Sequence, residues 1–323
     1  MGAPALPLTE PSPIEAAREA IEHTRRLLFP FRFERWLTLG AVAFLDQCGR
    51  GGMGGTLPGG PPGGGGLPSP GSGSGGLSDA ASWFNAHLGV IVGFAVGALV
   101  VIVAVVALML WIGSRATFVY IDDVASGRAE VSRPWSAHAE RANSHFAWRF
   151  GLAAAFFAAV AVLVALAVGA ALLIARGGVA GAAFGAVTLI LLVPLLFILL
   201  LAAGLASMAL RDFVAPLQMF TGASCGPAVR LFASLVRAHP VPFLLFVLLK
   251  VVFEVVQGVL ILSAACVTLC CILLPVVTQT VLQPLFFFER AWSLHLLRQM
   301  GYDLIGREAV LEGGAAPDAL PPV

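Results

Sequence analysis

Long apolar runs separated by polar connections make up most of this 323-residue chain. A helix that crosses a lipid bilayer needs roughly 20 predominantly apolar residues. Four runs reach that length, namely 87–113, 150–175, 180–210 and 241–288. The last run is long enough for two helices joined by a turn, which we place near residues 263–266. The pattern therefore predicts an all-α, polytopic membrane helix bundle with at least five transmembrane helices.

A shorter apolar run covers residues 36–48, a length that more often indicates a buried or re-entrant segment. The arginines favour a transmembrane helix instead. Sixteen arginines fall on one side of the predicted membrane: before this run, in every second connection, and after the last run. Only Arg50 and Arg176 fall in the connections on the other side. Basic residues accumulate on the cytoplasmic side of a membrane. We therefore predict six transmembrane helices in the cell inner membrane with both termini in the cytoplasm. The short first helix is accommodated if the bilayer thins locally or if Arg32 and Arg35 extend to the interface.

Three cytoplasmic segments are predicted to be amphipathic helices that lie at the membrane surface. Segment 13–29 starts with a capping box formed by Ser12 and Glu15, and a proline takes its first helical position. Segments 134–147 and 227–238 also start with a proline, and apolar residues recur along all three at helical spacing. Helices of this kind contact lipid headgroups through their polar face.

These segments belong to a longer internal correspondence. Phe118, Val119 and Gly127 in one connection match Phe213, Val214 and Gly222 in the next, each 95 residues apart. The spacing predicts a threefold repeat in which each unit is an interfacial helix followed by two transmembrane helices. The alternative is that any helix entering a membrane shares this pattern.

The domain organisation follows from composition. A single transmembrane domain is predicted for residues 1–312. Glycine and proline dominate residues 49–78, which cannot bury enough apolar surface to order themselves. We therefore expect a disordered outer loop there, and a disordered tail at residues 313–323.

A family resemblance supports the six-helix prediction. The segment 211–217, the pair His239-Pro240 and the end of the run at Leu248, Leu249 and Lys250 resemble a group of uncharacterised prokaryotic six-span membrane proteins with a domain of unknown function. Those proteins are loosely similar to the membrane domain beside some glycerophosphodiester phosphodiesterases. The resemblance covers most of the chain and implies a membrane location, but it implies no catalytic residues.

Polar residues inside the predicted helices form a candidate intramembrane site. Lys250, Glu254 and Gln257 share one helical face, and Gln279 and Gln283 return on the last helix. At about 1.5 Å per residue, Lys250 lies roughly 14 Å from the start of its helix, near the bilayer centre. Charges at that depth are costly and mark an internal pair or a transport pathway. We favour a structural pair between Lys250 and Glu254, with a transport site as the alternative.

Four cysteines are predicted to lie near the outer membrane face: Cys48, Cys266, Cys270 and Cys271. Their simplest role is that of small apolar residues. A disulfide between Cys48 and one of the other three is a second hypothesis, because an oxidising outer compartment permits it. A metal site that includes His87 or Asp46 is a third, although the spacing fits no standard zinc pattern.

Small residues predict where helices approach closely. Gly89, Gly93 and Gly97 form two consecutive G-x-x-x-G steps, and Gly181 and Gly185 form another. Such faces allow close contact between helix backbones in lipid. We favour packing within the chain over a dimer contact.

The composition excludes several classes of function. The net charge of +1 provides no basic face for nucleic acid, and the sequence contains neither a nucleotide-binding motif nor a coherent catalytic set. We expect no enzymatic activity and no cofactor. The leading hypothesis is a non-enzymatic accessory or scaffold protein that contacts membrane lipids and other membrane proteins. The alternative is a small transporter or permease that uses the Lys250–Glu254 face; the oligomeric state is left open.

The predicted topology can be tested by labelling with a membrane-impermeant maleimide. In a variant without native cysteines, we expect Ser74→Cys to react in intact cells. Ser136→Cys should react only after the membrane is permeabilised, because the arginines place its connection inside. The opposite pattern of labelling would reverse the topology.

Overall fold

The computed structural model describes residues 10–29, 31–48, 76–267 and 277–305, and within these ranges every regular element is a helix. The elements are α1 (Pro13–Leu28), α2 (Phe33–Cys48), α3 (Gly76–Ser126), α4 (Ser132–Ala137), α5 (Ala139–Arg176), α6 (Gly178–Ala209), the π-helical turn η1 (Leu210–Val214), α7 (Ala215–Thr221), α8 (Cys225–Ala238), α9 (Pro240–Val267), α10 (Val277–Val281) and α11 (Gln283–Gln299). The predicted all-α class is therefore confirmed for the described part of the chain.

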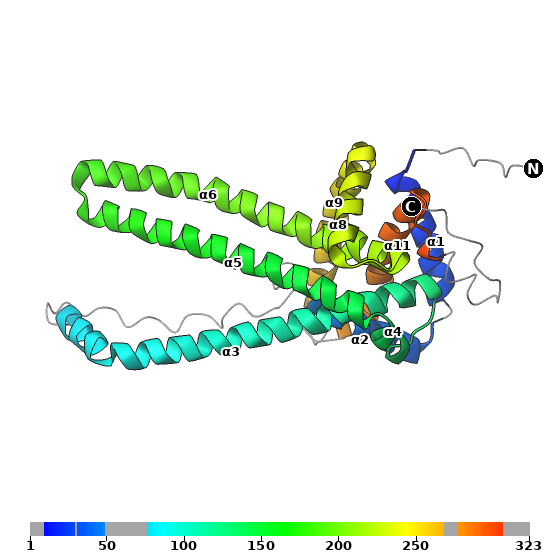
Figure 1. Cartoon of the computed structure of the whole chain (residues 1–323), viewed down its shortest axis with the longest axis horizontal. Helices are drawn as coiled ribbons and strands as arrows, with labels where there is room; N and C mark the ends of the chain where they lie inside the picture. Colours follow the sequence, from blue (N-terminus) through cyan, green and yellow to red (C-terminus); the bar gives the residue numbers. More distant parts are fainter. Residues whose placement is uncertain (1–9, 30, 49–75, 268–276, 306–323) are drawn as a thin grey trace, which may run out of the picture.

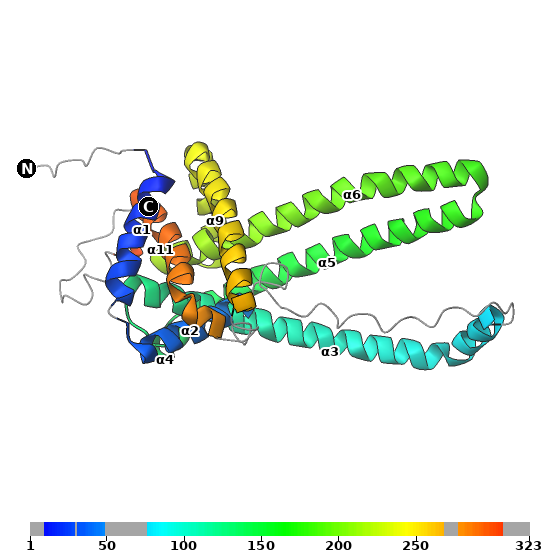
Figure 2. The ribbon, with the colours of Figure 1, turned by 180° about the vertical axis from the view of Figure 1, so that it is seen from behind.

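Long helices project from a compact body. The body contains α1, α2, α4, η1, α7, α8, α10, α11 and the last part of α3 (Figure 1). The first part of α3 and the hairpin of α5 and α6 extend from it in the same direction, whereas α9 leaves it at a steep angle to them (Figures 1 and 2). The projecting helices expose apolar side chains along most of their length, as expected of surfaces in contact with lipid.

Four described helical segments are long and apolar enough to cross a membrane: Ala86–Ser126, Ala139–Arg176, Gly178–Thr221 and Pro240–Ser263. They indicate a membrane protein. The predicted first span corresponds to α2, which has 16 residues. It lies beside the polar end of α3, because Arg35 donates to the Gly127 carbonyl and Asp46 accepts from Thr117. At about 1.5 Å per residue, α2 is roughly 24 Å long and ends where the apolar part of α3 begins.

Several predicted boundaries were wrong. No turn occurs at residues 263–266, because α9 continues to Val267; residues 259–274 contain neither glycine nor proline to end a helix. The outer loop does not extend to residue 78, since α3 starts at Gly76. The rest of that loop and the tail 313–323 lie outside the described residues.

Two of the three predicted interfacial segments are single helices. In α1 the Ser12 hydroxyl accepts a hydrogen bond from the Glu15 amide at 3.4 Å, which caps the helix start. Segment 227–238 lies within α8. Segment 134–147 is instead divided at His138, where α4 ends and α5 begins. The long helix α5 therefore starts inside the body.

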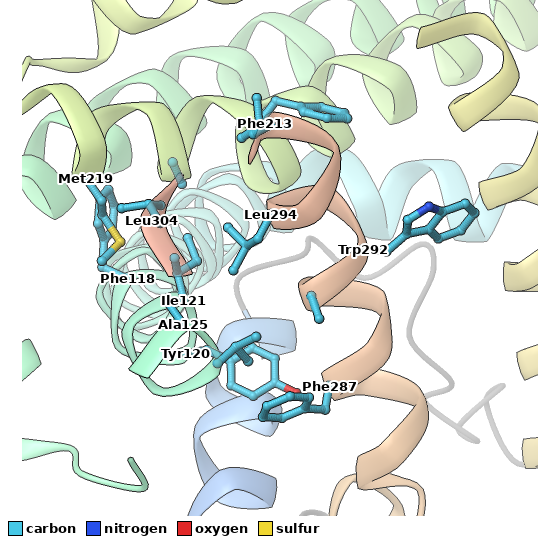
Figure 3. Close-up of a cluster of buried hydrophobic side chains, with 14 of the residues drawn as sticks. Phe118, Tyr120, Ile121, Ala125, Phe213, Met219, Phe287, Trp292, Leu294 and Leu304 are labelled. Atoms are coloured by element: carbon cyan, nitrogen blue, oxygen red, sulfur yellow. The ribbon is translucent and has the colours of Figure 1, made fainter. Parts of the chain in front are cut away.

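Three glycines with left-handed backbone conformation follow three of the helices that end in the body. Gly127 after α3 has φ 73°, Gly222 after α7 has φ 72° and Gly301 just after α11 has φ 93°. Glycine adopts this conformation without steric cost, and it commonly ends helices. The C-terminal part of α3, the helices α7 and α11, and apolar residues of α1, α2, η1, α8 and α9 together form the apolar core of the body. Figure 3 shows this core, with Phe118, Tyr120 and Ile121 of α3, Phe213 of η1, Met219 of α7, and Phe287 and Leu294 of α11.

The two groups of small residues differ in their surroundings. A Cβ atom on Gly185 would lie 2.5 Å from the Ala170 carbonyl oxygen and 2.7 Å from Ile174 Cγ1, so α5 and α6 meet closely at this glycine. A Cβ atom on Gly89, Gly93 or Gly97 would meet nothing within 4 Å. Packing within the chain is therefore confirmed for the hairpin of α5 and α6, and the expectation of such packing for the glycines of α3 was wrong.

This contrast predicts opposite effects of the same substitution. Gly185→Ala should destabilise the protein by about 1–3 kcal/mol, because the methyl group overlaps the facing backbone. Gly97→Ala should be neutral or should stabilise by up to about 1 kcal/mol, because alanine favours the helix and finds open space. Unfolding in detergent by titration with dodecyl sulfate, followed by circular dichroism, measures both. Equal effects of the two substitutions would contradict the packing described.

Candidate functional site

Six charged side chains meet inside the body. They are Asp46 of α2, Arg211 and Asp212 of η1, Lys250 of α9, and Glu289 and Arg290 of α11. We call them the buried charge cluster, since none is more than 7% exposed. The group contains three carboxylates and three cations, so its formal charges balance.

Lys250 joins two helical segments to α9. Its Nζ atom lies 2.7 Å from Asp212 Oδ2 and 2.9 Å from Glu289 Oε1. Arg211 bridges the same two carboxylates: its Nε donates to Asp212 at 3.1 Å, and its Nη2 pairs with Glu289. These hydrogen bonds between ions are stronger than those between neutral groups.

Arg290 connects this part of the cluster to α2. Its Nη2 donates to Asp46 Oδ2 at 2.9 Å, and its Nη1 donates to the Arg211 carbonyl at 2.7 Å. The other Asp46 oxygen accepts from the Thr117 hydroxyl at 2.5 Å. The cluster thus holds α2, η1, α9 and α11 together through charged groups, and the Thr117 hydroxyl ties α3 to it.

A proline explains the local geometry of η1. In a regular α-helix the ring of Pro216 would clash with the carbonyl of residue 212 and would leave it without a hydrogen-bond donor. Here the chain widens by one residue, and the Ala215 amide donates to the Leu210 carbonyl five residues before it. The wider turn buries all five residues of η1, including the adjacent Arg211 and Asp212. Such π-helical turns occur mostly as single turns within longer helices.

The predicted polar residues are only partly brought together. Lys250 belongs to the cluster, and Glu254 lies one turn further along the same helix, α9. Gln257 is buried. Gln283 donates to the Tyr120 hydroxyl at 3.1 Å, and the Tyr120 ring lies 5.9 Å from the Arg290 guanidinium.

The hydrogen bond that Gln279 makes is to a residue outside the cluster. Gln279 donates to Gln47 of α2 at 3.1 Å, and so links α10 to α2. Lys250 and Arg211 contact the same carboxylate oxygen of Glu289, so Lys250 lies close to the end of α6. The predicted depth of Lys250 near the bilayer centre stays a prediction.

Sequence reasoning missed most of the cluster. Arg211 and Arg290 were interpreted only as cytoplasmic charges that orient the chain, and both are buried. Asp46, Asp212 and Glu289 were not predicted as their partners. One signal was present: an arginine stands next to a carboxylate in Arg211-Asp212 and in Glu289-Arg290, and each arginine precedes a helix-ending glycine by eleven residues.

The cluster lies within the part of the chain that matches a known family. Residues 11–302 match the model of a family of unknown function, DUF7544. The chain belongs to this family. Neither curated proteins nor solved structures match the chain. The family match agrees with the resemblance to proteins of unknown function, and it lends no support to a similarity with the phosphodiesterase-associated domain.

The cysteine hypotheses remain predictions. The side chains of Cys48, Cys266, Cys270 and Cys271 lie outside the described residues. Cys225 of α8 is a buried free thiol, and burial raises its pKa to about 12. Among the described side chains, no group of three His, Cys, Asp or Glu residues could hold a metal ion.

Two histidines form a second, partly buried polar contact, between α1 and α11. The rings of His23 and His295 meet edge to face with centroids 5.4 Å apart. His295 Nδ1 lies 2.9 Å from Glu19 Oε2, and His23 Nε2 lies 2.8 Å from the Val124 carbonyl. Burial is the main cause, with the nearby His23 and Arg298, of a His295 pKa lowered to about 4, and Asp303 partly opposes the shift. The neutral ring therefore donates its Nδ1 proton to Glu19.

This histidine makes the fold sensitive to acid. The unfolded chain binds the proton of His295 near pH 6.5, whereas the folded pKa is about 4. Between these values the unfolded state binds more protons, so stability is complete above pH 6.5 and falls as the pH approaches 4. We expect a loss of about 1–3 kcal/mol, measured by unfolding in detergent at several pH values. His295→Gln should remove most of this slope; an unchanged slope would contradict the assignment.

Removing one charge from the cluster should cost more than removing a balanced pair. Lys250→Met leaves Asp212 and Glu289 with an excess negative charge, at a cost of about 3–5 kcal/mol. Asp212→Asn should be similarly harmful. The double variant restores the balance and should recover at least about half of the loss. Folded yield and unfolding in mild detergent measure the three variants.

A second double variant distinguishes the effect of specific contacts on stability from the effect of net charge. Lys250→Met with Glu254→Gln restores the same net charge but leaves both carboxylates that contact Lys250. We expect it to recover less stability than the pair with Asp212. Equal destabilisation by the single and the double variants would refute the charge-balance argument.

Proposed function

We propose that the protein is a non-enzymatic accessory or scaffold protein of the membrane, with the buried charge cluster as its structural joint. The observation that carries the proposal is that the cluster is neutralised within itself and sealed from solvent. Its charges pair with one another across α2, η1, α9 and α11, and none is more than 7% exposed. A group that binds and releases a solute must reach water in at least one state. The cluster as arranged serves to fix helices.

The surface grooves support the same conclusion. One groove of about 700 Å³ runs along α3 and is lined by apolar residues from Val90 to Ile102. A second, of about 400 Å³, lies on α5 around Trp148. Neither is lined by a residue of the cluster, so the described grooves give its charges no route to a solute.

The finer architecture that we propose has six membrane-inserted helices in three units, with both termini on the cytoplasmic side of the inner membrane. The units are α1–α3, α4–α7 and α8–α11. The conformation of Gly127, Gly222 and Gly301 supports the repeat, because each glycine follows the last helix of one unit. The arginine distribution supports the orientation. In this arrangement the 16 residues of α2 cross the membrane where the bilayer is thinned locally.

The lipid and protein contacts of the scaffold also belong to the proposal. Apolar side chains exposed on α3, α5, α6 and α9 would contact lipid tails or the helices of other membrane proteins. The similarity to the phosphodiesterase-associated membrane domain remains an expectation from sequence alone.

The experiment compares folding with transport in the balanced double variant, Lys250→Met with Asp212→Asn. If the role of the cluster is only to fix the helices, the folded double variant should complement a deletion strain as well as the wild type does. Proteoliposomes of the wild type should show no proton or ion flux above protein-free vesicles. A folded double variant that fails to complement, together with wild-type flux that depends on Lys250, would replace the scaffold with a transporter.

A further inference from the structure

Arg115 is placed differently from the arginines of the buried charge cluster. It is the first charged residue after the stretch 86–114, which contains no Asp, Glu, Lys or Arg. It is half-buried at the point where the exposed apolar part of α3 enters the body. Among the described residues no carboxylate pairs with it, whereas Arg211 and Arg290 each contact carboxylates directly. A positive charge therefore stands at the surface without a counter-ion from the described chain.

Aromatic rings fix the position of this guanidinium. Its central carbon lies 4.7 Å from the ring centroid of Trp111 on α3 and 5.5 Å from that of Trp135 on α4. The two indoles meet edge to face at 6.2 Å, and α4 packs against α3 in the body (Figure 1). The Trp111 Nε1 proton is donated to Asn143 Oδ1 at 3.2 Å, which ties the ring to α5. Contact with ring faces orients an arginine and leaves its polar edge for another partner.

The hydrogen-bonding capacity of Arg115 is largely unused. A guanidinium carries five N–H donors. Its Nη1 lies 3.4 Å from the Trp135 carbonyl and its Nη2 lies 3.5 Å from Asn143 Oδ1, both at the long limit for a hydrogen bond. The planar edge of a guanidinium matches two oxygens of a phosphate, with two parallel hydrogen bonds.

We propose that Arg115, Trp111, Trp135 and Asn143 form a binding site for the phosphate group of a membrane phospholipid. The proposal rests on the membrane location stated above. The surroundings favour a lipid over a soluble phosphate, because the α3 side chains that precede the site are apolar and exposed. A bound lipid would place its acyl chains along them. Indole rings are also enriched at the level of lipid headgroups. The arginine would hold the phosphate while the indoles contact the glycerol region.

The test is a titration of the detergent-purified full-length protein with short-chain phosphatidylglycerol, followed by calorimetry and by tryptophan fluorescence. We expect saturable binding that Arg115→Gln weakens at least about tenfold, since a charged hydrogen-bonded pair is lost. Arg115→Lys should recover only part of the affinity, because an ammonium keeps the charge but not the two-pronged geometry. Arg18→Gln is the matched control on the same body, as Arg18 pairs with Glu15, and it should bind as the wild type does.

Two further ligands identify the source of the phosphate. Diacylglycerol with the same acyl chains lacks the phosphate and should not compete, and inorganic phosphate should bind far more weakly than the lipid. Unchanged lipid binding by Arg115→Gln, competition by diacylglycerol, or equal binding of inorganic phosphate would each overturn the assignment. If Arg115→Gln fails to fold, equal affinity of Arg115→Lys and the wild type refutes the two-pronged contact. Membrane fractionation of the wild type tests the location separately, so its failure is distinguishable from a failure of lipid binding.

Discussion

Mutual neutralisation of the buried charge cluster is the interaction on which the arrangement of the body depends. Removing an ion from water costs several kcal/mol, and that cost is offset only when partners of opposite charge are held in good geometry. Here Lys250, Arg211 and Arg290 each contact a carboxylate from another helical element. The helices that carry the charges can therefore assemble in few other ways, because most alternatives would strand a buried ion. The cluster specifies the arrangement of the body more than it adds to net stability.

The rest of the body is built so that these charges can meet. Pro216 enforces the wide turn η1, which buries Arg211 and Asp212 side by side. Gly127, Gly222 and Gly301 follow their helices in a conformation that few other residues adopt, and so let the chain leave the helical path there. The charge cluster directly adjoins the apolar core, since Tyr120 belongs to the core and also contacts Arg290 and Gln283.

The projecting helices follow a different rule. Without a hydrophobic driving force between helices in lipid, close contact depends on small residues that let backbones approach. The hairpin of α5 and α6 meets this condition at Gly185, whereas Gly93 and Gly97 of α3 face open space in the chain described here. Where α3 reaches the body, Arg115 and two indoles replace the glycines. The same helix thus changes from an apolar surface to a polar, aromatic one within a few residues, which suits the boundary between lipid tails and headgroups.

The sequence by itself determined the class of this protein and little of its site. Long charge-free runs allow only helices in a bilayer, because each backbone polar group must be satisfied within its own segment, so the helices at 150–175 and 180–210 could be predicted directly. The cap at Ser12 and the break at Gly222 are also local, and local chemistry decides them.

Only the tertiary structure decided which charges pair. Glu254 is four residues from Lys250 and was the natural partner in sequence, yet the contacts that the structure shows for Lys250 come from Asp212 and Glu289, 38 and 39 residues away. The inclination of α9 and the extra residue in η1 bring these carboxylates to the lysine. Neither feature follows from helical periodicity, because both depend on how several helices pack at once.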